Sequence, residues 1–196
     1  MVSPFVVKDL FSKKTFNEIH SLVVDYGRNI HGQFDSDFNR TSVHNLAPLV
    51  DVHFHLTDFA SEIFKMTLKP SYVFMSNYFD GGICPVHRDR PQCFRTIDLM
   101  VEQESSTPWE IRISNPLPDS EWENYKGLEF FNIDPLNPEH VEKQFDITWN
   151  DFSLNPNQAV CYSGTHSWHY RPKPSIGRSD LVFFHFVEES YSGDLD

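Results

Sequence analysis

His87 and Asp89 are the two residues of this sequence whose types and spacing best suit the binding of one metal ion. They follow a run typical of a strand that ends near Phe79, and in an extended backbone residues i and i+2 project to the same side. His53 and His55 have the same spacing but lie in a segment of helical periodicity, where two residues turn the chain by about 200°. We therefore take His87 and Asp89 as candidate ligands, and the third ligand must come from elsewhere.

Residues 161–186 contain three histidines that can supply this third ligand, namely His166, His169 and His185. His185 has an odd position in the last strand-like run. Arg178, if the strand extends that far, has an even position and shares a side with Phe184 and Phe186. On this alternation we discount His185, and the residues alone leave His166 and His169 open.

Two amphipathic helices are expected to support the site from the first third of the chain. Residues 15–26 combine a capping box at Thr15 and Glu18 with an apolar face, and Gly27 ends the run. Apolar residues recur at steps of three and four in the second helix, residues 49–69. The segment between the two helices reads as a loop.

Short strand-like runs follow, separated by clusters of Pro, Asn, Gly and Asp. They occupy residues 71–79, 93–101, 109–113, 128–133, 145–149, 158–163 and 181–186. Many short strands at this spacing predict a β-sandwich or barrel rather than an alternating parallel α/β sheet. We expect a single domain over residues 1–196, with supporting helices in residues 1–70 and a β core in residues 71–188.

The composition narrows the class of protein. The 196 residues include 18 Phe and are 39% hydrophobic, which excludes disorder for most of the chain. The 28 acidic residues exceed the 16 basic ones by 12, so nucleic acid is a poor expectation as a partner. No apolar run approaches the ~20 residues of a membrane span, and the first residues lack the pattern of a signal peptide. A cytoplasmic protein with no membrane contact and with inert cysteines is expected.

The pattern around the candidate ligands resembles the Fe(II)/2-oxoglutarate-dependent dioxygenases, and within them the prolyl-hydroxylase-like branch. In that branch a Tyr-containing, Gly-rich approach precedes His-x-Asp, as YFDGGICPVHRD does at residues 78–89. The distal part resembles His-x-x-Pro followed by Gly-Arg. His169 lies three residues before Pro172 and nine before Arg178, whereas His166 lies twelve before Arg178. The resemblance therefore selects His169 as the third ligand.

The resemblance covers roughly residues 71–187 and implies a fold, a double-stranded β-helix or jelly roll. It implies that His87, Asp89 and His169 bind Fe(II). It also implies 2-oxoglutarate as cosubstrate and O2 as oxidant, with succinate and CO2 released and a substrate hydroxylated. Arg178 is then expected to hold the far carboxylate of 2-oxoglutarate, because a planar guanidinium binds both oxygens. Tyr78 is the expected helper in this cosubstrate contact.

Two positions qualify what the resemblance implies. Asp180 stands where many relatives carry Ser or Thr beside the cosubstrate, which puts that second contact in question. In the related halogenases a small residue replaces the carboxylate ligand, so the Asp at position 89 disfavours halogenation.

The charges near the candidate ligands favour an anionic ligand. Residues 84–95 and 163–180 contain six basic side chains against two acidic ones. We hypothesise that Arg88, Arg90 or Arg171 meets a carboxylate of the primary substrate, and solvated loop charges are the alternative. The expected substrate is a small molecule, an amino acid or a short peptide.

Two other interpretations stay open. A non-catalytic cupin-like protein, serving as a metal-binding or scaffold module, would use the same ligands, and a structural β-sandwich would carry incidental histidines. The Pro- and Asn-rich insert, residues 102–157, is expected to form a lid over the substrate. The oligomeric state, the substrate and the metal loaded in the cell stay open.

Overall fold

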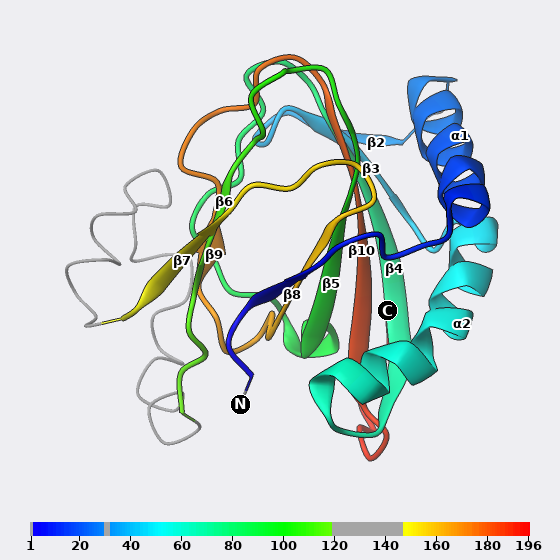
Figure 1. The fold of residues 1–196 in the computed structure, drawn as a ribbon, viewed down its shortest axis with the longest axis vertical. Coiled ribbons are helices and arrows are strands. Elements are labelled where there is room, and N and C mark those ends of the chain that lie inside the picture. The colour runs from blue at the N-terminus through cyan, green and yellow to red at the C-terminus, as the bar shows by residue number, and fades with distance from the viewer. Residues whose placement is uncertain (1, 30–31, 119–146) are drawn as a thin grey trace.

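Two β-sheets face each other, and two helices lie against the outside of the larger sheet (Figure 1). The computed structural model describes residues 2–29, 32–118 and 147–196. The strand expected at residues 128–133 and the middle of the insert expected to form a lid lie outside the described residues.

The larger sheet contains seven strands among the described residues, and every pairing in it is antiparallel. Neighbouring strands come from distant parts of the chain, so the centre of the sheet depends on long-range pairing. In spatial order the strands are β1 (Phe5–Val7), β8 (Ala159–Tyr162), β5 (Arg95–Gln103), β10 (Ser179–Glu188), β4 (Leu68–Tyr78), β3 (Arg40–His44) and β2 (Gln33–Asp35).

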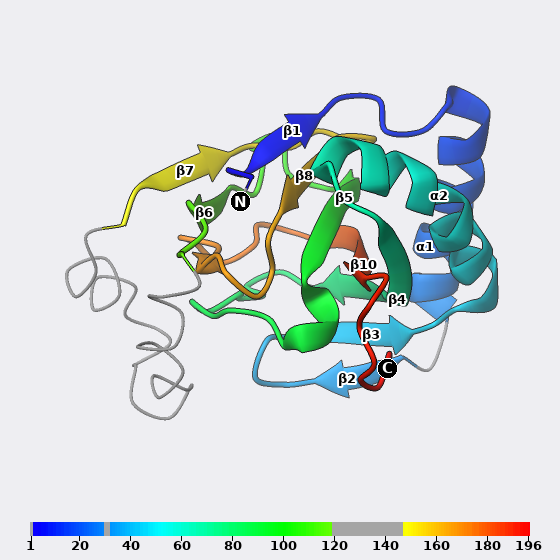
Figure 2. The ribbon, with the colours of Figure 1, turned by 90° about the horizontal axis from the view of Figure 1, so that it is seen from below.

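The smaller sheet places β6 (Ile111–Ser114) between β7 (Trp149–Phe152) and β9 (His169–Tyr170). An isolated antiparallel bridge joins His87 to His169 and continues this sheet by one pairing. Figure 2 shows the smaller sheet on one side of the larger sheet and the helices on the other. Two facing antiparallel sheets wound from alternating parts of one chain make a double-stranded β-helix, and the predicted fold class is confirmed.

Both expected helices are present, with shifted ends. The first, α1 (Lys13–Asn29), begins before the predicted residue 15, because the Ser12 hydroxyl accepts a hydrogen bond from the Thr15 backbone N–H at 3.2 Å. The capping box predicted at Thr15 is therefore wrong by one turn, and the helix passes Gly27. The second, α2 (Ala47–Phe64), ends where Lys65 adopts a left-handed φ of 56°. Neither helix is long and apolar enough to cross a membrane, within the described residues.

The helices cover one face of the larger sheet with an apolar layer. Alternate residues of the two central strands, Val182, Phe184 and Phe186 of β10 with Val73 and Met75 of β4, are almost completely buried there. The helices contribute seven buried residues to this layer: Ile19, Val23, Val24, Leu49, Leu56, Ala60 and Phe64.

The segment read as a loop between the helices forms a hairpin, which the sequence analysis missed. The strands β2 and β3 pair with each other, and β3 then pairs with β4 so that Arg40 lies opposite Tyr78 and His44 opposite Phe74. Directly opposed residues share a face of a sheet. The hairpin thus adds Arg40 and His44 to the face that looks toward the smaller sheet.

Candidate metal centre

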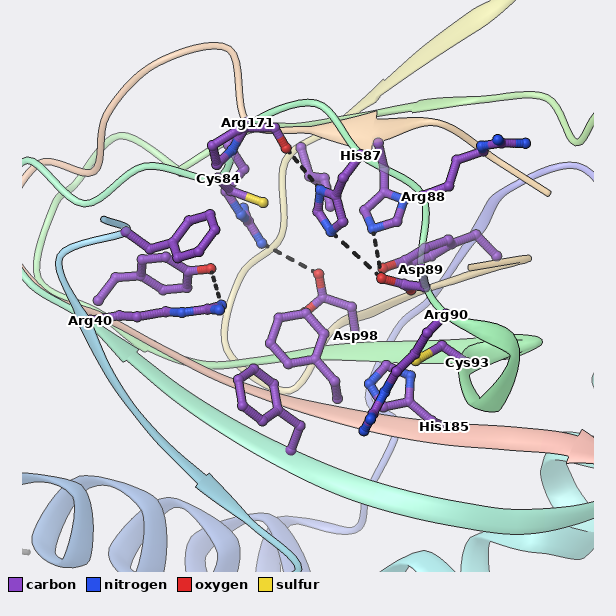
Figure 3. A pocket seen from close by; sticks show the side chains of 18 of the residues that line it. Arg40, Cys84, His87, Arg88, Asp89, Arg90, Cys93, Asp98, Arg171 and His185 are labelled. Carbon is purple, nitrogen blue, oxygen red and sulfur yellow. Dashed lines mark hydrogen bonds and ion pairs between the residues drawn. The ribbon is translucent and has the colours of Figure 1, made fainter. Parts of the chain in front are cut away.

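Three predicted ligands, His87, Asp89 and His169, meet between the two sheets. Figure 3 shows His87 and Asp89 pointing toward each other. The Nε2 atoms of both histidines lie 3.5 Å from the same carboxylate oxygen, Asp89 Oδ1. Their ring centroids are 4.1 Å apart. The structure therefore brings together side chains that are remote in the sequence, at a separation that one ion can bridge.

The backbone fixes these residues before any ligand binds. The His87 N–H donates to the His169 carbonyl at 3.0 Å, and the His169 N–H returns the bond to the His87 carbonyl at 2.9 Å. The Asp89 N–H donates to the Gly164 carbonyl at 2.9 Å. This ladder of bonds joins the β4–β5 connection to the segment around β9, and so sets the spacing of the three side chains.

Each imidazole is oriented by a backbone carbonyl. His87 Nδ1 lies 2.8 Å from the Pro85 carbonyl oxygen, and His169 Nδ1 lies 3.1 Å from that of Ser167. A carbonyl oxygen only accepts hydrogen bonds, so both Nδ1 atoms carry a proton, and in each ring Nε2 is the nitrogen directed toward Asp89 and available to a metal ion. Metal-binding histidines are commonly held in this way.

The electrostatics of the group favour a cation. Burial would raise the pKa of Asp89, but the two imidazoles hold it well below its ordinary value, so the residue is a carboxylate at neutral pH. Burial lowers the pKa of His87. Asp89 Oδ2 is buried without a hydrogen-bond partner among the described residues. Two imidazoles and one carboxylate are the donor set of non-haem Fe(II) oxygenases, and these residues fit such an ion.

The three ligands line a cavity of about 380 Å³. This volume lies in the range of small-molecule sites, roughly 300–1,000 Å³. Its walls are largely aromatic and include Phe38, Tyr72, Phe74, Tyr78, Tyr162 and Phe183. Four arginines also line it, Arg40, Arg88, Arg90 and Arg171, against two carboxylates, Asp89 and Asp98. The expected local excess of positive charge is therefore present around the ligands.

Tyr78 lies in this cavity as the sequence analysis expected, but Arg178 does not line it. The Nε of Arg178 donates to Asp180 Oδ1 at 2.8 Å, and the same oxygen accepts a bond from Asn77 at 2.7 Å. Asn77 belongs to the alternate residues of β4 that face the helices. The alternation along β10 is as predicted, but the side shared by Arg178 and Phe184 is the helix side and not the cavity side.

The same inversion corrects the expectation for His185. This residue lines the cavity, and one of its nitrogens lies within 4.8 Å of ligand atoms of both Asp89 and Cys93. Burial lowers the pKa of His185 to about 4, so it is neutral near pH 7. His166 does not line the cavity and bonds Thr165 at 2.7 Å. The choice of His169 over His166 thus agrees with the geometry.

Asp98 and Arg171 form a buried ion pair inside the cavity. Arg171 Nη2 lies 3.4 Å from Asp98 Oδ2, while Nη1 donates to the Trp109 carbonyl and the guanidinium lies 4.4 Å from the Trp109 ring centroid. Burial raises the pKa of Asp98 to about 6, and Arg171 opposes that rise. The sequence analysis missed Asp98 and Arg40, because each lies inside a strand with no motif around it.

Arg88 and Arg90 flank Asp89 and point away from each other (Figure 3). The guanidinium of Arg88 lies 4.6 Å from the ring of Trp168. That of Arg90 lies 4.4 Å from the ring of Tyr72, and its Nε donates to the Tyr72 hydroxyl at 3.3 Å. Arg90 is exposed and lines the cavity.

Comparison with known proteins relates the chain to others through its fold. No protein-family model and no curated protein matches it. Among solved structures, the α-ketoglutarate-dependent epimerase SnoN from nogalamycin biosynthesis is similar with a TM-score of 0.68 and 8% identity, over 95% of this chain and 78% of that one. HygX from Streptomyces hygroscopicus, with nickel, 2-oxoglutarate and hygromycin B bound, gives 0.64 and 11%, over 97% and 84%.

A Pseudomonas putida prolyl-4-hydroxylase is also similar, with a TM-score of 0.63 and 10% identity over 95% of this chain and 93% of that one. The fold of the chain is thus the fold of Fe(II)/2-oxoglutarate oxygenases, and the resemblance read from the sequence is confirmed at that level. Identities this low bear on the fold alone.

Proposed function

We propose that this protein is an Fe(II)/2-oxoglutarate-dependent oxygenase acting on a small molecule, an amino acid or a short peptide. One observation carries the proposal: a carboxylate and two imidazoles, each imidazole already oriented by a backbone carbonyl, converge on a cavity in this fold. A binding module without catalysis would have less need of an aromatic cavity lined by four arginines beside its ion.

We assign iron binding to His87, Asp89 and His169. This donor set would hold the ion and would leave positions open for the reactants. When bound, iron and 2-oxoglutarate supply the oxidising chemistry, in which 2-oxoglutarate and O2 give succinate and CO2 and one oxygen atom enters the substrate. The chain itself holds the ligands in place and keeps Asp89 ionised.

Hydroxylation is the outcome we propose for the substrate. Asp89 fills the position that a halide would need, which argues against halogenation. The fold by itself leaves the outcome open, because its neighbours include SnoN, named as an epimerase, and SnoK, named as a carbocyclase.

We propose Arg90 as the contact for a carboxylate of the primary substrate. Of the three arginines considered from the sequence, Arg171 is engaged by Asp98 and Arg88 lies against Trp168. Arg90 is exposed on the cavity wall, and its contact with the Tyr72 ring leaves guanidinium N–H groups for an incoming anion. Exchange of Arg90 for Gln should raise the KM for such a substrate and leave the affinity for 2-oxoglutarate unchanged.

The test of the function has two parts. Anaerobic addition of Fe(II) and 2-oxoglutarate should produce a visible charge-transfer band, because the keto acid chelates the iron. Succinate release across a panel of amino acids, peptides and small molecules should then identify stimulated turnover. A protein that binds Fe(II) at one equivalent but gives neither signal would be the metal-binding module instead.

A further inference from the structure

Arg40 occupies a position in the cavity that the sequence analysis did not foresee. It lies on β3, directly opposite Tyr78 of β4, and its Nη1 donates to the Tyr78 hydroxyl at 2.9 Å. Its guanidinium lies 4.5 Å from the ring centroid of Phe38 and 5.2 Å from that of Phe74. In Figure 3, Arg40 and the metal ligands lie toward opposite ends of the cavity, with Asp98 and Arg171 between them.

The guanidinium of Arg40 has donors to spare. Its Nε is buried and has no hydrogen-bond partner among the described residues. Its nearest acidic contact is Asp35, a partly exposed residue whose Oδ2 lies 3.6 Å from Nη2. A buried donor without a partner is costly, by about 1–3 kcal/mol, and a charged one by more. Aromatic walls around an incompletely satisfied guanidinium form an environment in which a bound carboxylate would be strongly held.

The other two candidate arginines each have a closer carboxylate partner than Arg40 has in Asp35. Arg171 has Asp98 at 3.4 Å and the Trp109 carbonyl as partners, so its charge is already balanced inside the cavity. Arg178 is paired with Asp180 outside the cavity. Among the arginines that line the cavity, Arg40 therefore lies away from the metal ligands and still has an N–H group that can donate a hydrogen bond.

We propose that Arg40, assisted by the Tyr78 hydroxyl, binds the far carboxylate of 2-oxoglutarate. This inference rests on the function proposed above, and it assigns the carboxylate contact to Arg40 of β3 in place of Arg178, which directly precedes β10. A linear keto diacid whose keto-acid end lay at the metal ligands would have its second carboxylate available for the other end of the cavity. Burial raises the pKa of Tyr78 above its ordinary value, so its hydroxyl stays protonated and can donate to the carboxylate while it accepts from Arg40.

The test separates the far carboxylate from the keto-acid end. Iron-loaded protein is titrated anaerobically with 2-oxoglutarate and with 2-oxopentanoate, which has the same keto-acid end and no second carboxylate, and the charge-transfer band reports binding of each. Arg40→Met should weaken 2-oxoglutarate binding at least tenfold and leave 2-oxopentanoate within twofold. A double-mutant cycle of this kind isolates the contact between Arg40 and the carboxylate.

The matched control is Arg178→Met combined with Asp180→Asn, which removes the outer ion pair without leaving an unpaired carboxylate. It should leave both affinities within twofold. The inference is overturned if this control shows the selective loss, or if Arg40→Met weakens both keto acids equally or neither. If the wild-type protein binds iron and gives no band with either keto acid, the proposed function fails instead.

Tyr78→Phe provides a second variant that removes a single hydroxyl and keeps the ring. It should weaken 2-oxoglutarate by about threefold to tenfold, the range expected for one hydrogen bond, and leave 2-oxopentanoate unchanged. Tyr78→Phe tests the proposed carboxylate contact if the thermal melting and the iron stoichiometry of Arg40→Met show that this variant does not fold. An unchanged ratio of the two keto-acid affinities would then contradict the role of the Arg40–Tyr78 pair.

Discussion

The two faces of β10 are buried to a similar extent but contact different parts of the protein. The even-numbered side, with Val182, Phe184 and Phe186, is fully buried against the helices and carries only apolar side chains along that stretch. The odd-numbered side is also well buried at Leu181 and His185, but it faces the smaller sheet and the candidate metal ligands. The burial and the alternation of the side chains along β10 therefore identify two faces, but they do not indicate which face binds a ligand.

What distinguishes the faces is which part of the chain lies opposite. The helices present side chains that fill the space completely, so the even face becomes an interior of ordinary density. The smaller sheet is held off the odd face by arginine, histidine and aromatic side chains, and a cavity of about 380 Å³ remains between them. The polar residue His185 on the odd face borders this cavity, and its Nδ1 lies 3.1 Å from Thr96 Oγ1 of the neighbouring strand β5.

The largest expected difference between the faces is in metal affinity. Asp89→Asn on the cavity side removes the charge of a ligand, and Asp180→Asn on the helix side makes the same chemical change. We expect Asp89→Asn to weaken binding of Fe(II) by more than roughly a hundredfold, since even partners of metal ligands contribute that much. Asp180→Asn should stay within twofold. Calorimetric titration with Fe(II) under nitrogen measures both, and equal losses would contradict the assignment.

The next largest effect should appear in stability and on the opposite face. Phe184 is completely buried, and its replacement by Ala should lower the free energy of unfolding by about 3–5 kcal/mol. Phe183 is only partly buried and lines the cavity, so Phe183→Ala should cost clearly less. Urea denaturation of the metal-free proteins compares the two. Equal losses would mean that the cavity face is packed as tightly as the helix face.

Much of this arrangement was predictable from local patterns. His87 and Asp89 stand two residues apart after a strand, so local spacing was enough to propose them as candidate ligands. The choice of His169 over His166 came from the family resemblance and its distance to Arg178, because the residues alone left both open. The two helices and the central strands β4, β5, β8 and β10 also carry clear periodicity. Local patterns are the part of a fold that short windows of sequence record.

The other features of the fold and the cavity depend on which distant segments of the chain pair with each other. A short stretch of sequence does not contain that information. The strand β3 reads RTSVH, a mixed run of five residues that becomes a strand by pairing with β4. Arg40 joins the cavity through that pairing alone. The sequence analysis assigned Arg178 to the cavity side of β10 and His185 to the opposite side, which is the reverse of what the structure shows. Both sides of the strand carry apolar residues, so only the position of the helices distinguishes them.

A smaller effect on the cavity side is expected at Gly164. A Cβ at this position would collide with Asp89 Oδ2 and with the Cys93 carbonyl, and would lie 2.8 Å from Thr96 Oγ1. Gly164→Ala should therefore displace Asp89 and weaken metal binding by about 10–100-fold, as loss of a supporting contact does. The measurement is the same Fe(II) titration. Gly81→Ala is the control for backbone strain alone, because Gly81 has a φ of 81° while a Cβ there meets nothing within 4 Å.

The smallest predicted effect concerns acid stability, and it arises on the helix face. His53 of α2 is 2% exposed, and its ring centroid lies 4.6 Å from that of Phe186. Burial lowers its pKa from 6.5 to about 3. Below pH 6.5 the unfolded chain takes up a proton at this residue that the folded chain refuses, so the folded state loses stability as the pH falls toward 3.

The loss from His53 approaches about 1.4 kcal/mol per pH unit, or about 1–2 kcal/mol between pH 6.5 and pH 5. His53→Leu should remove this part of the slope, whereas His55→Leu, two residues away on the exposed side of α2, should retain it. Urea midpoints at both pH values measure the difference. His185, with a pKa of about 4, keeps a similar slope in both variants, so it is the difference between the variants that counts. If the two slopes coincide, the His53 ring is protonated in the folded protein and the helix face is not the dry apolar layer described above.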